Sequence, residues 1–309
     1  MTSHTTLPAH VPTAVDVRAA AERISRYVRR TPVLHASIDG RPLALKLEHL
    51  QLTGAFKLRG ALNALLSGGP TSRVITASGG NHGLGVATAA RLLGIKAVVY
   101  VPETVPEAKA RRLEASGAEL VRLGEHYAVA AEAARRHAET EGVRYLHAYD
   151  DPSVAAGQGT IGHEIAADAP GCDTVAVAVG GGGLVAGVRL GAGDRRVVAV
   201  EPEGCQSLHA ALAAGEPVDT PVDSVASSAL GAARLGDVPF AVLRAHQVST
   251  ALVTEDEIIA ARDRLWEEFR IAAEPAAAVP FAAWLAGRVP GTEPCLVICG
   301  ANADWRPAD

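Results

Sequence analysis

Aromatic residues are scarce in this chain of 309 residues, since phenylalanine, tryptophan and tyrosine together make up only 4% of it. Hydrophobic residues nevertheless account for 48%, so alanine, valine and leucine must build most of the core. With 20% charged residues, the composition is that of an ordinary globular protein, not of a disordered chain. At this length we expect two lobes, with a cleft between them that a ligand can enter.

Long apolar runs and strong basic clusters are also missing. The longest apolar stretches, such as residues 175–179, are far too short to span a bilayer and predict buried strands. The formal net charge is −5, and the arginine pairs at 111–112 and 135–136 fall in helical patterns of mixed charge. We therefore expect neither a membrane nor a nucleic acid as a partner.

Cysteine is present without any pattern that would bind zinc. Cys172, Cys205, Cys295 and Cys299 form no C-x-x-C pair, and no signal peptide precedes them. These features predict a reducing, cytoplasmic location. The first dozen residues lack a hydrophobic period and are expected to form a loose arm, and we expect no appended regulatory domain after Cys299.

Short apolar runs alternate with longer amphipathic patterns along most of the chain. The predicted strands are residues 73–76, 97–101, 119–123, 174–179, 197–200 and 295–299. Because these strands are apolar throughout and separated by helices, they indicate parallel sheet covered on both faces, which is the α/β class. Ligands of such sheets bind beyond the carboxyl ends of the strands, where helices begin. Three junctions of this kind contain glycine.

The first junction is residues 77–83, Ala-Ser-Gly-Gly-Asn-His-Gly, which follow a predicted strand and open a helix to about Leu93. The free N–H groups and the positive dipole of a helix N-terminus favour an anion, and the glycines let it approach the backbone. The alternative is a plain tight turn in which Ser78 or Asn81 caps the helix.

The second junction is the run of four glycines at 180–183, between a predicted strand and a helix that starts near Leu184. Such a run is costly in entropy and is typical of backbone that wraps a phosphate. It lacks the Lys-Ser or Lys-Thr of a P-loop, and its spacing makes a poor dinucleotide fingerprint. A flexible hinge is the alternative.

The third junction is Cys299-Gly300-Ala301-Asn302, at the end of the last predicted strand. Its thiol is either a buried structural group or a weak donor to a ring nitrogen.

Lys57 lies where a predicted strand passes through a turn into a helix. A single lysine among residues of mixed charge is ordinarily a solvent-exposed helix residue, and the local sequence alone would not distinguish Lys57 from that. A lysine that attacks an aldehyde must first lose its proton, which requires partial burial or a cationic neighbour; Phe56, Leu58 and Arg59 offer both.

Taken together, these segments resemble the fold-type II pyridoxal-phosphate enzymes, and within them the serine/threonine dehydratase group, almost from end to end. The matching stretches are residues 30–32, 46–48 through 59–60, 77–83, 157–160, 180–183, 200–202, 274–276 and 299–302. The resemblance implies a two-lobed fold similar to the tryptophan synthase β subunit, with residues 1–72 and 148–309 in the larger, cofactor-binding domain and 73–147 in the smaller one. It also implies a homodimer.

The resemblance assigns a role to each junction. Lys57 would hold pyridoxal phosphate as a Schiff base and then move the substrate's α-proton. The cofactor would be bound by Phe56, Lys57, Asn81 at its ring hydroxyl, Gly180, Gly181, Gly182, Gly183 and Leu184 at its phosphate, Glu274, and Cys299 at its pyridine nitrogen. The substrate carboxylate would be bound by Ser78, Gly79, Gly80, Asn81 and His82. A thiol partner does not favour a protonated pyridine ring, so elimination fits better than transamination.

The implied reaction is β-elimination from a β-hydroxy amino acid such as L-threonine or L-serine, which yields a 2-oxo acid and ammonia. The related racemases have serine where Gly79 stands, and glycine cannot carry a proton, so racemisation is not expected. Ala55 and Ala277 replace a serine and a glycine that are usual in the family, which leaves the substrate side chain open. A β-replacement synthase, a dehydratase for another β-hydroxy amino acid and a non-catalytic cofactor-binding relative are the alternatives.

A divalent cation is a further open question. Glu201 matches a carboxylate that binds a cation in some members, but Ser207 stands at the nearest position for a second carboxylate. A hard cation needs several oxygen ligands, so Glu201 could instead cap the strand end. His35, His126, His147 and His163 have no motif around them and are assigned no role.

Overall fold

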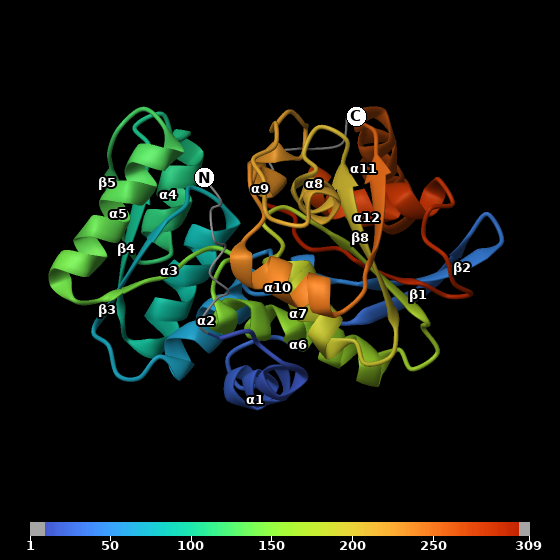
Figure 1. Ribbon diagram of the computed structural model, residues 1–309, viewed down its shortest axis with the longest axis horizontal. Coiled ribbons are helices and arrows are strands. Elements are labelled where there is room, and N and C mark those ends of the chain that lie inside the picture. The colour runs from blue at the N-terminus through green and yellow to red at the C-terminus, as the bar shows by residue number, and fades with distance from the viewer. Residues whose placement is uncertain (1–9, 303–309) are drawn as a thin grey trace.

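Two twisted β-sheets, each flanked by helices, form two lobes that lie side by side (Figure 1). The computed structural model describes residues 10–302, so most of the arm expected at the N-terminus lies outside the described residues. The six-stranded sheet of the larger lobe has the order β1-β2-β10-β7-β8-β9. Its strands are β1 (Val33–Ile38), β2 (Arg41–Lys46), β7 (Thr174–Ala178), β8 (Arg196–Pro202), β9 (Ser249–Val253) and β10 (Cys295–Val297). All neighbouring strands are parallel except β1 and β2, which form an antiparallel hairpin.

The four-stranded sheet of the smaller lobe has the order β5-β4-β3-β6 and is entirely parallel. Its strands are β3 (Arg73–Ala77), β4 (Lys96–Val101), β5 (Ala118–Arg122) and β6 (Arg144–Tyr145). All of them fall within residues 73–147, the segment expected to form the smaller domain; the division into domains itself stays a prediction.

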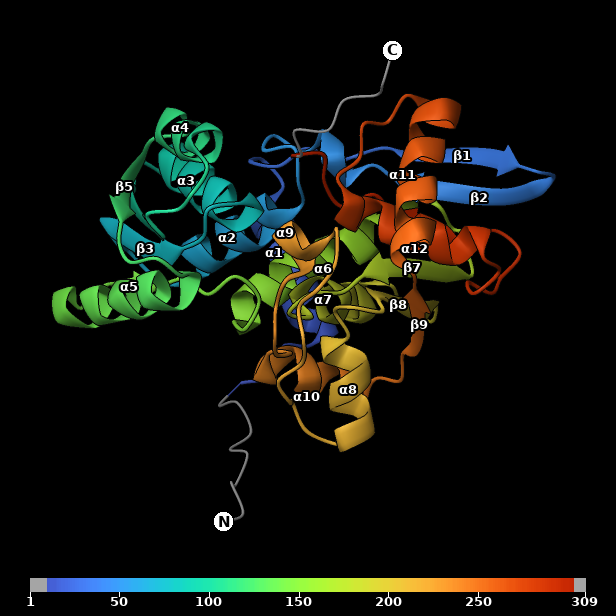
Figure 2. The ribbon, with the colours of Figure 1, turned by 90° about the horizontal axis from the view of Figure 1, so that it is seen from above.

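Helices cover both sheets, and several of them meet between the lobes (Figure 2). They are α1 (Ala14–Ile24), the short 3-10 helix η1 (Glu48–Leu50), α2 (Lys57–Ser67), α3 (Asn81–Leu93), α4 (Glu107–Ala115), α5 (Tyr127–Glu141), α6 (Pro152–Asp168), α7 (Gly183–Gly191), α8 (Ser207–Ala214), α9 (Ser227–Leu230), α10 (Asp237–Ala245), α11 (Glu255–Phe269) and α12 (Pro275–Leu285). None of the helices within residues 10–302 combines the length and the apolar composition that crossing a bilayer requires.

The predicted strands correspond to β3, β4, β5, β7, β8 and β10, and the α/β class is confirmed. The expected final strand was too long, since β10 ends at Val297 and not at Cys299. Strands β1 and β9 were missed because they are edge strands whose exposed residues interrupt the apolar pattern. The turn between β1 and β2 did carry a signal: Asp39 and Gly40 both have positive φ, as a two-residue hairpin turn requires.

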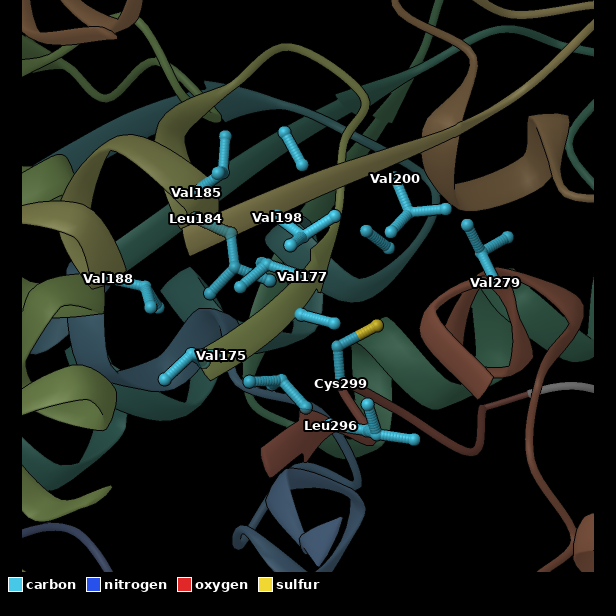
Figure 3. Close-up of a cluster of buried hydrophobic side chains, with 14 of the residues drawn as sticks. Val175, Val177, Leu184, Val185, Val188, Val198, Val200, Val279, Leu296 and Cys299 are labelled. Carbon is cyan, nitrogen blue, oxygen red and sulfur yellow. The ribbon is translucent and has the colours of Figure 1, made fainter. Parts of the chain in front are cut away.

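Small residues let the central helices of the larger lobe approach closely. A methyl group on Gly187 of α7 would overlap the carbonyl oxygen of Ala155 in α6, and one on Gly191 would overlap that of Gly159. Aliphatic side chains of β7, β8 and α7, including Val177, Val198 and Leu184, fill the space between this helix pair and the sheet (Figure 3). A core poor in aromatics thus reaches tight packing through close backbone contact.

A buried network of charges joins elements that are distant in sequence. The Arg59 guanidinium of α2 donates to the Glu48 carboxylate at 2.8 Å and to the Glu164 carboxylate of α6 at 2.7 and 2.9 Å. Lys46 of β2 donates to Glu164 at 2.6 Å and to the carbonyl oxygen of Thr31 at 2.6 Å, and the Thr31 hydroxyl donates to Glu48. Two cations and two carboxylates therefore balance in a place closed to water.

Removing one member of this network should destabilise the folded protein strongly. We expect Glu164→Ala to lower the free energy of unfolding by about 3–5 kcal/mol, because Lys46 and Arg59 would then be buried with too little negative charge. Urea unfolding measures the change. The control is Glu268→Ala, which breaks an exposed pair with Arg264 and should cost less than about 1 kcal/mol. Equal losses in both variants would contradict this account.

Candidate active site

The three glycine-bearing junctions and Lys57 converge between the lobes. The Phe56 N–H donates to the Cys299 carbonyl oxygen at 3.1 Å, and Ala55 forms an antiparallel bridge with Gly300. The Lys57 amine donates to the carbonyl oxygen of Ala148 at 2.8 Å. The next residue, Tyr149, packs against the glycine run, since a methyl group on Gly183 would lie 3.0 Å from its Cα atom. Segments that are far apart in sequence therefore surround one lysine.

Lys57 is the first residue of α2, and its side chain has no carboxylate partner among the described residues. Its amine lies 5.1 Å from the centre of the Phe56 ring and bonds only to a neutral carbonyl group. Burial lowers the pKa of Lys57 to about 8, against the opposing influence of Cys299 and Glu274. The amine is thus partly neutral near physiological pH, as a nucleophile or a base requires.

The loop before α3 presents a helix N-terminus to the cleft. Helix α3 begins at Asn81, and the Gly80 N–H donates to the Ser78 hydroxyl at 3.2 Å. The first N–H groups of a helix have no partner in a preceding turn, so they can bind an anion here. A side chain at Gly79 would crowd Val105, whose Cγ2 atom would lie 3.1 Å from the new Cβ.

The side chain of Asn81 is fixed by two residues from the end of the chain. Its amide donates to the Glu274 carboxylate at 2.9 and 3.1 Å, and its oxygen accepts a hydrogen bond from Asn302 at 2.9 Å. Its amide nitrogen is therefore held against the Glu274 carboxylate. Sequence patterns assigned no role to Asn302, although it lies in the Cys-Gly-Ala-Asn stretch.

His82 points away from the cleft. Its Nε2 atom lies 3.0 Å from the Thr76 hydroxyl and 3.1 Å from the Leu146 carbonyl oxygen. Burial, with a smaller contribution from the Lys57 charge, lowers the pKa of His82 to about 3, so the imidazole stays neutral. Any contact of His82 with a substrate is therefore left to its main-chain N–H.

The glycine run at 180–183 is packed on both sides. A methyl group on Gly181 would overlap the Tyr149 ring, and one on Gly180 would lie 2.9 Å from the Cα atom of Leu230. Gly182 has a φ of +90°, which favours glycine, and α7 begins at Gly183. A glycine run packed this closely at a helix N-terminus has little freedom to act as a flexible hinge. The packing therefore favours the alternative, a loop that binds a phosphate.

Cys299 and Glu274 form the wall opposite the loop. The Cys299 side chain is 3% exposed and lies among aliphatic side chains at the end of β10 (Figure 3). Burial, with the nearby Glu274, raises the pKa of the Cys299 thiol well above its ordinary value, so the thiol stays protonated and can donate a weak hydrogen bond. Burial also raises the pKa of Glu274, while the bond from Asn81 opposes the shift.

Glu201 serves a helix and not a cluster of carboxylates. Its two oxygens accept the main-chain N–H groups of Leu208 at 2.8 Å and His209 at 2.9 Å, at the start of α8. Burial raises the pKa of Glu201 to about 7. The Ser207 hydroxyl donates to the Gly180 carbonyl oxygen at 2.6 Å, so α8 also braces the glycine run. Across residues 10–302, no three His, Cys, Asp or Glu side chains gather where a metal ion could bind.

Comparison with known proteins identifies the family. The family model described as "Pyridoxal-phosphate dependent enzyme" matches residues 24–300. An L-threonine ammonia-lyase of Geobacter sulfurreducens is 37% identical over 93% of this chain and 75% of its own length. A crystal structure of threonine deaminase from T.th. superposes with a TM-score of 0.90 at 36% identity, covering 96% of this chain and all of that one. Serine racemase from Dictyostelium discoideum gives 0.88 at 31% identity, over 95% of this chain and 99% of its own.

The expected cofactor and fold type are thereby confirmed, because both the family model and the solved relatives span nearly the whole described chain. The chain belongs to the pyridoxal-phosphate-dependent enzymes, and it is an ammonia-lyase of that family.

Proposed function

We propose that this ammonia-lyase removes water from a β-hydroxy amino acid, such as L-threonine or L-serine, and yields a 2-oxo acid and ammonia. The observation that carries the proposal is the Lys57 amine, which has a lowered pKa and donates to the carbonyl oxygen of Ala148, next to the Tyr149 that packs against the glycine run. The relatives named as threonine ammonia-lyases and threonine deaminase support the same reaction.

The residues of the cleft fit pyridoxal phosphate. The main-chain N–H groups of residues 180–184 would hold the phosphate at the start of α7. The Asn81 side chain would border the ring hydroxyl, the Cys299 thiol would face the ring nitrogen, and Phe56 and Glu274 would border the ring. When bound, the cofactor supplies an electron sink that acidifies the α-proton of an attached amino acid.

The protein's own groups then bind the substrate and move its proton. The N–H groups of Gly79, Asn81 and His82 would hold the substrate carboxylate and fix the α-carbon beside Lys57. The N–H groups of Ser78 and Gly80 already donate, to the Tyr100 carbonyl oxygen and to the Ser78 hydroxyl. The Lys57 amine would take the α-proton, because it is the group in the cleft whose lowered pKa suits a base. The neutral His82 imidazole takes no part in proton transfer, since it is bonded to Thr76 and Leu146 inside the smaller lobe.

The division into domains, with residues 73–147 as the smaller one, is part of this proposal. It is supported by the position of β3 to β6, all of which lie in that segment. The homodimer and the cytoplasmic location stay predictions, the first from the resemblance and the second from the cysteine pattern.

Lys57 should be indispensable. We expect Lys57→Ala, with cofactor supplied, to lose at least about a thousandfold in 2-oxo acid formation across a panel of β-hydroxy amino acids. The control is Lys96→Ala, which removes an exposed lysine at the start of β4 and should leave the rate unchanged. The assay measures 2-oxo acid and ammonia together. Full activity of Lys57→Ala would exclude the assigned base, and silence of the wild type on every substrate would exclude the elimination.

The lowered pKa of Lys57 should appear in the pH dependence of cofactor capture. A protonated amine cannot attack an aldehyde, so the rate at which cofactor-free protein takes up pyridoxal phosphate should rise about tenfold per pH unit below pH 8 and level off above it. Cofactor absorbance follows the reaction, with free Nα-acetyl-lysine as the reference amine. A rate that keeps rising to about pH 10, the range of an ordinary lysine, would show that the pKa of Lys57 is not lowered.

A serine at Gly79 should not convert the protein into a racemase. In Gly79→Ser the new Cβ would crowd Val105, so we expect about a tenfold loss of elimination and no D-serine from L-serine. Val105→Ala in the same chain should restore most of the loss, and Val105→Ala alone is the control. If Gly79→Ser retained full activity, the loop would have more room than this packing provides.

A further inference from the structure

A small cavity of about 30 Å³ lies where the two lobes meet above the loop before α3. Gly79, Gly80 and Asn81 form one side of it, and Ser228 of α9 and Glu274 form part of the other. The loop proposed to hold the substrate carboxylate therefore borders this space directly. A substrate held by that loop would lie beside this cavity.

Two cations of α4 line the same cavity. Lys109 and Arg112 are one helical turn apart and both border it. Glu274 is the one acidic side chain among the described lining residues, and Asn81 already holds its carboxylate. The described lining thus holds two cationic side chains and one carboxylate, and Arg112 has a further interaction of its own.

Of the two cations, Lys109 is the one whose charge could pair with a ligand. Its side chain is half-buried, and within residues 10–302 it makes neither a side-chain hydrogen bond nor an ion pair. Its charge nevertheless acts on the Glu274 carboxyl group and opposes the rise in the pKa of that group. The neighbouring Arg111 differs, because its side chain is 66% exposed, it faces Glu107 at 3.9 Å and it does not line the cavity.

A simple β-hydroxy amino acid leaves this charge without a partner. Its single carboxylate is accounted for by the N–H groups at the start of α3, and the methyl group of threonine offers nothing to an ammonium group. A second carboxylate on the substrate would form a charge-assisted hydrogen bond in a partly enclosed space, where such a bond is strong.

On the basis of the proposed elimination, we propose that Lys109, with Arg112 beside it, selects a substrate whose β-carbon carries a carboxylate as well as the hydroxyl group, that is, a 2-amino-3-hydroxy dicarboxylic acid. The reaction needs no further reactant except water. The α-proton passes to Lys57, and the electron pair of the broken C–H bond forms the Cα–Cβ double bond. The β-hydroxyl departs with the electron pair of the broken C–O bond, takes up the proton that Lys57 accepted and is released as water. The enamine that leaves takes up water and gives a 2-oxo dicarboxylic acid and ammonia.

The test compares kcat/KM for 3-hydroxyaspartate and for L-threonine in the holoenzyme. We expect the wild type to prefer 3-hydroxyaspartate, and Lys109→Met to lose about 10- to 100-fold with it while changing less than about threefold with threonine. Lys109→Arg should keep most of the preference because it keeps the charge. Arg111→Met, which removes an exposed cation of the same helix, should change neither value.

Three outcomes would overturn the inference: equal losses with both substrates in Lys109→Met, which would make Lys109 a partner of the α-carboxylate; no loss with either; or a wild type that prefers threonine. Binding without turnover separates this inference from the proposed function. L-aspartate should perturb the cofactor absorbance at lower concentration than L-alanine does, and Lys109→Met should abolish the difference. If L-aspartate binds more tightly but no substrate yields a 2-oxo acid, the proposed elimination is rejected and the site for an acidic ligand is retained. If the wild type binds both ligands equally, the site itself is rejected.

Discussion

The buried contact between Arg59 and two carboxylates is the constraint on which the rest of the site depends. Arg59 lies on the first turn of α2, two residues after Lys57, and its guanidinium contacts Glu48 on one side and Glu164 of α6 on the other. Ions closed to water are tolerated only when their partners and geometry are nearly complete. The start of α2, with Lys57, therefore has one position relative to α6 and η1.

The two lysines near this helix illustrate how environment assigns a role. Lys46 has a carboxylate partner, Glu164, and belongs to the structural network. Among the described residues, Lys57 has only the carbonyl oxygen of Ala148 and the face of the Phe56 ring, so burial is not offset by a paired negative charge and its pKa falls to about 8. Because the first lysine is satisfied and the second is not, the second is the one available for covalent chemistry.

The other features of the site depend on close packing around the loops that surround the Lys57 amine. The glycine run is enclosed by Tyr149 and Leu230, and Gly79 is crowded by Val105, so there is little room for side chains in the two loops that we propose to bind anions. The contacts of Asn81 with Glu274 and Asn302 tie the smaller lobe to the larger one at the same place. Lys109 adds a charge from the smaller lobe, and on our proposal the approach of the two lobes would therefore affect the choice of substrate.

The sequence by itself determined the features that depend on local pattern: the α/β alternation, strands such as β3 and β7, the glycine-bearing junctions at 77–83 and 180–183, and Lys57 at the start of its helix. Local periodicity and glycine carry this information because backbone conformation depends mainly on neighbouring residues. Tertiary structure alone decided that Asn81 bonds to Glu274, 193 residues away, that His82 turns inward, and that Lys109 faces the cavity while Arg111 does not. Such contacts depend on how two sheets and their helices pack together, and no pattern within one segment records which distant side chains that packing brings into reach.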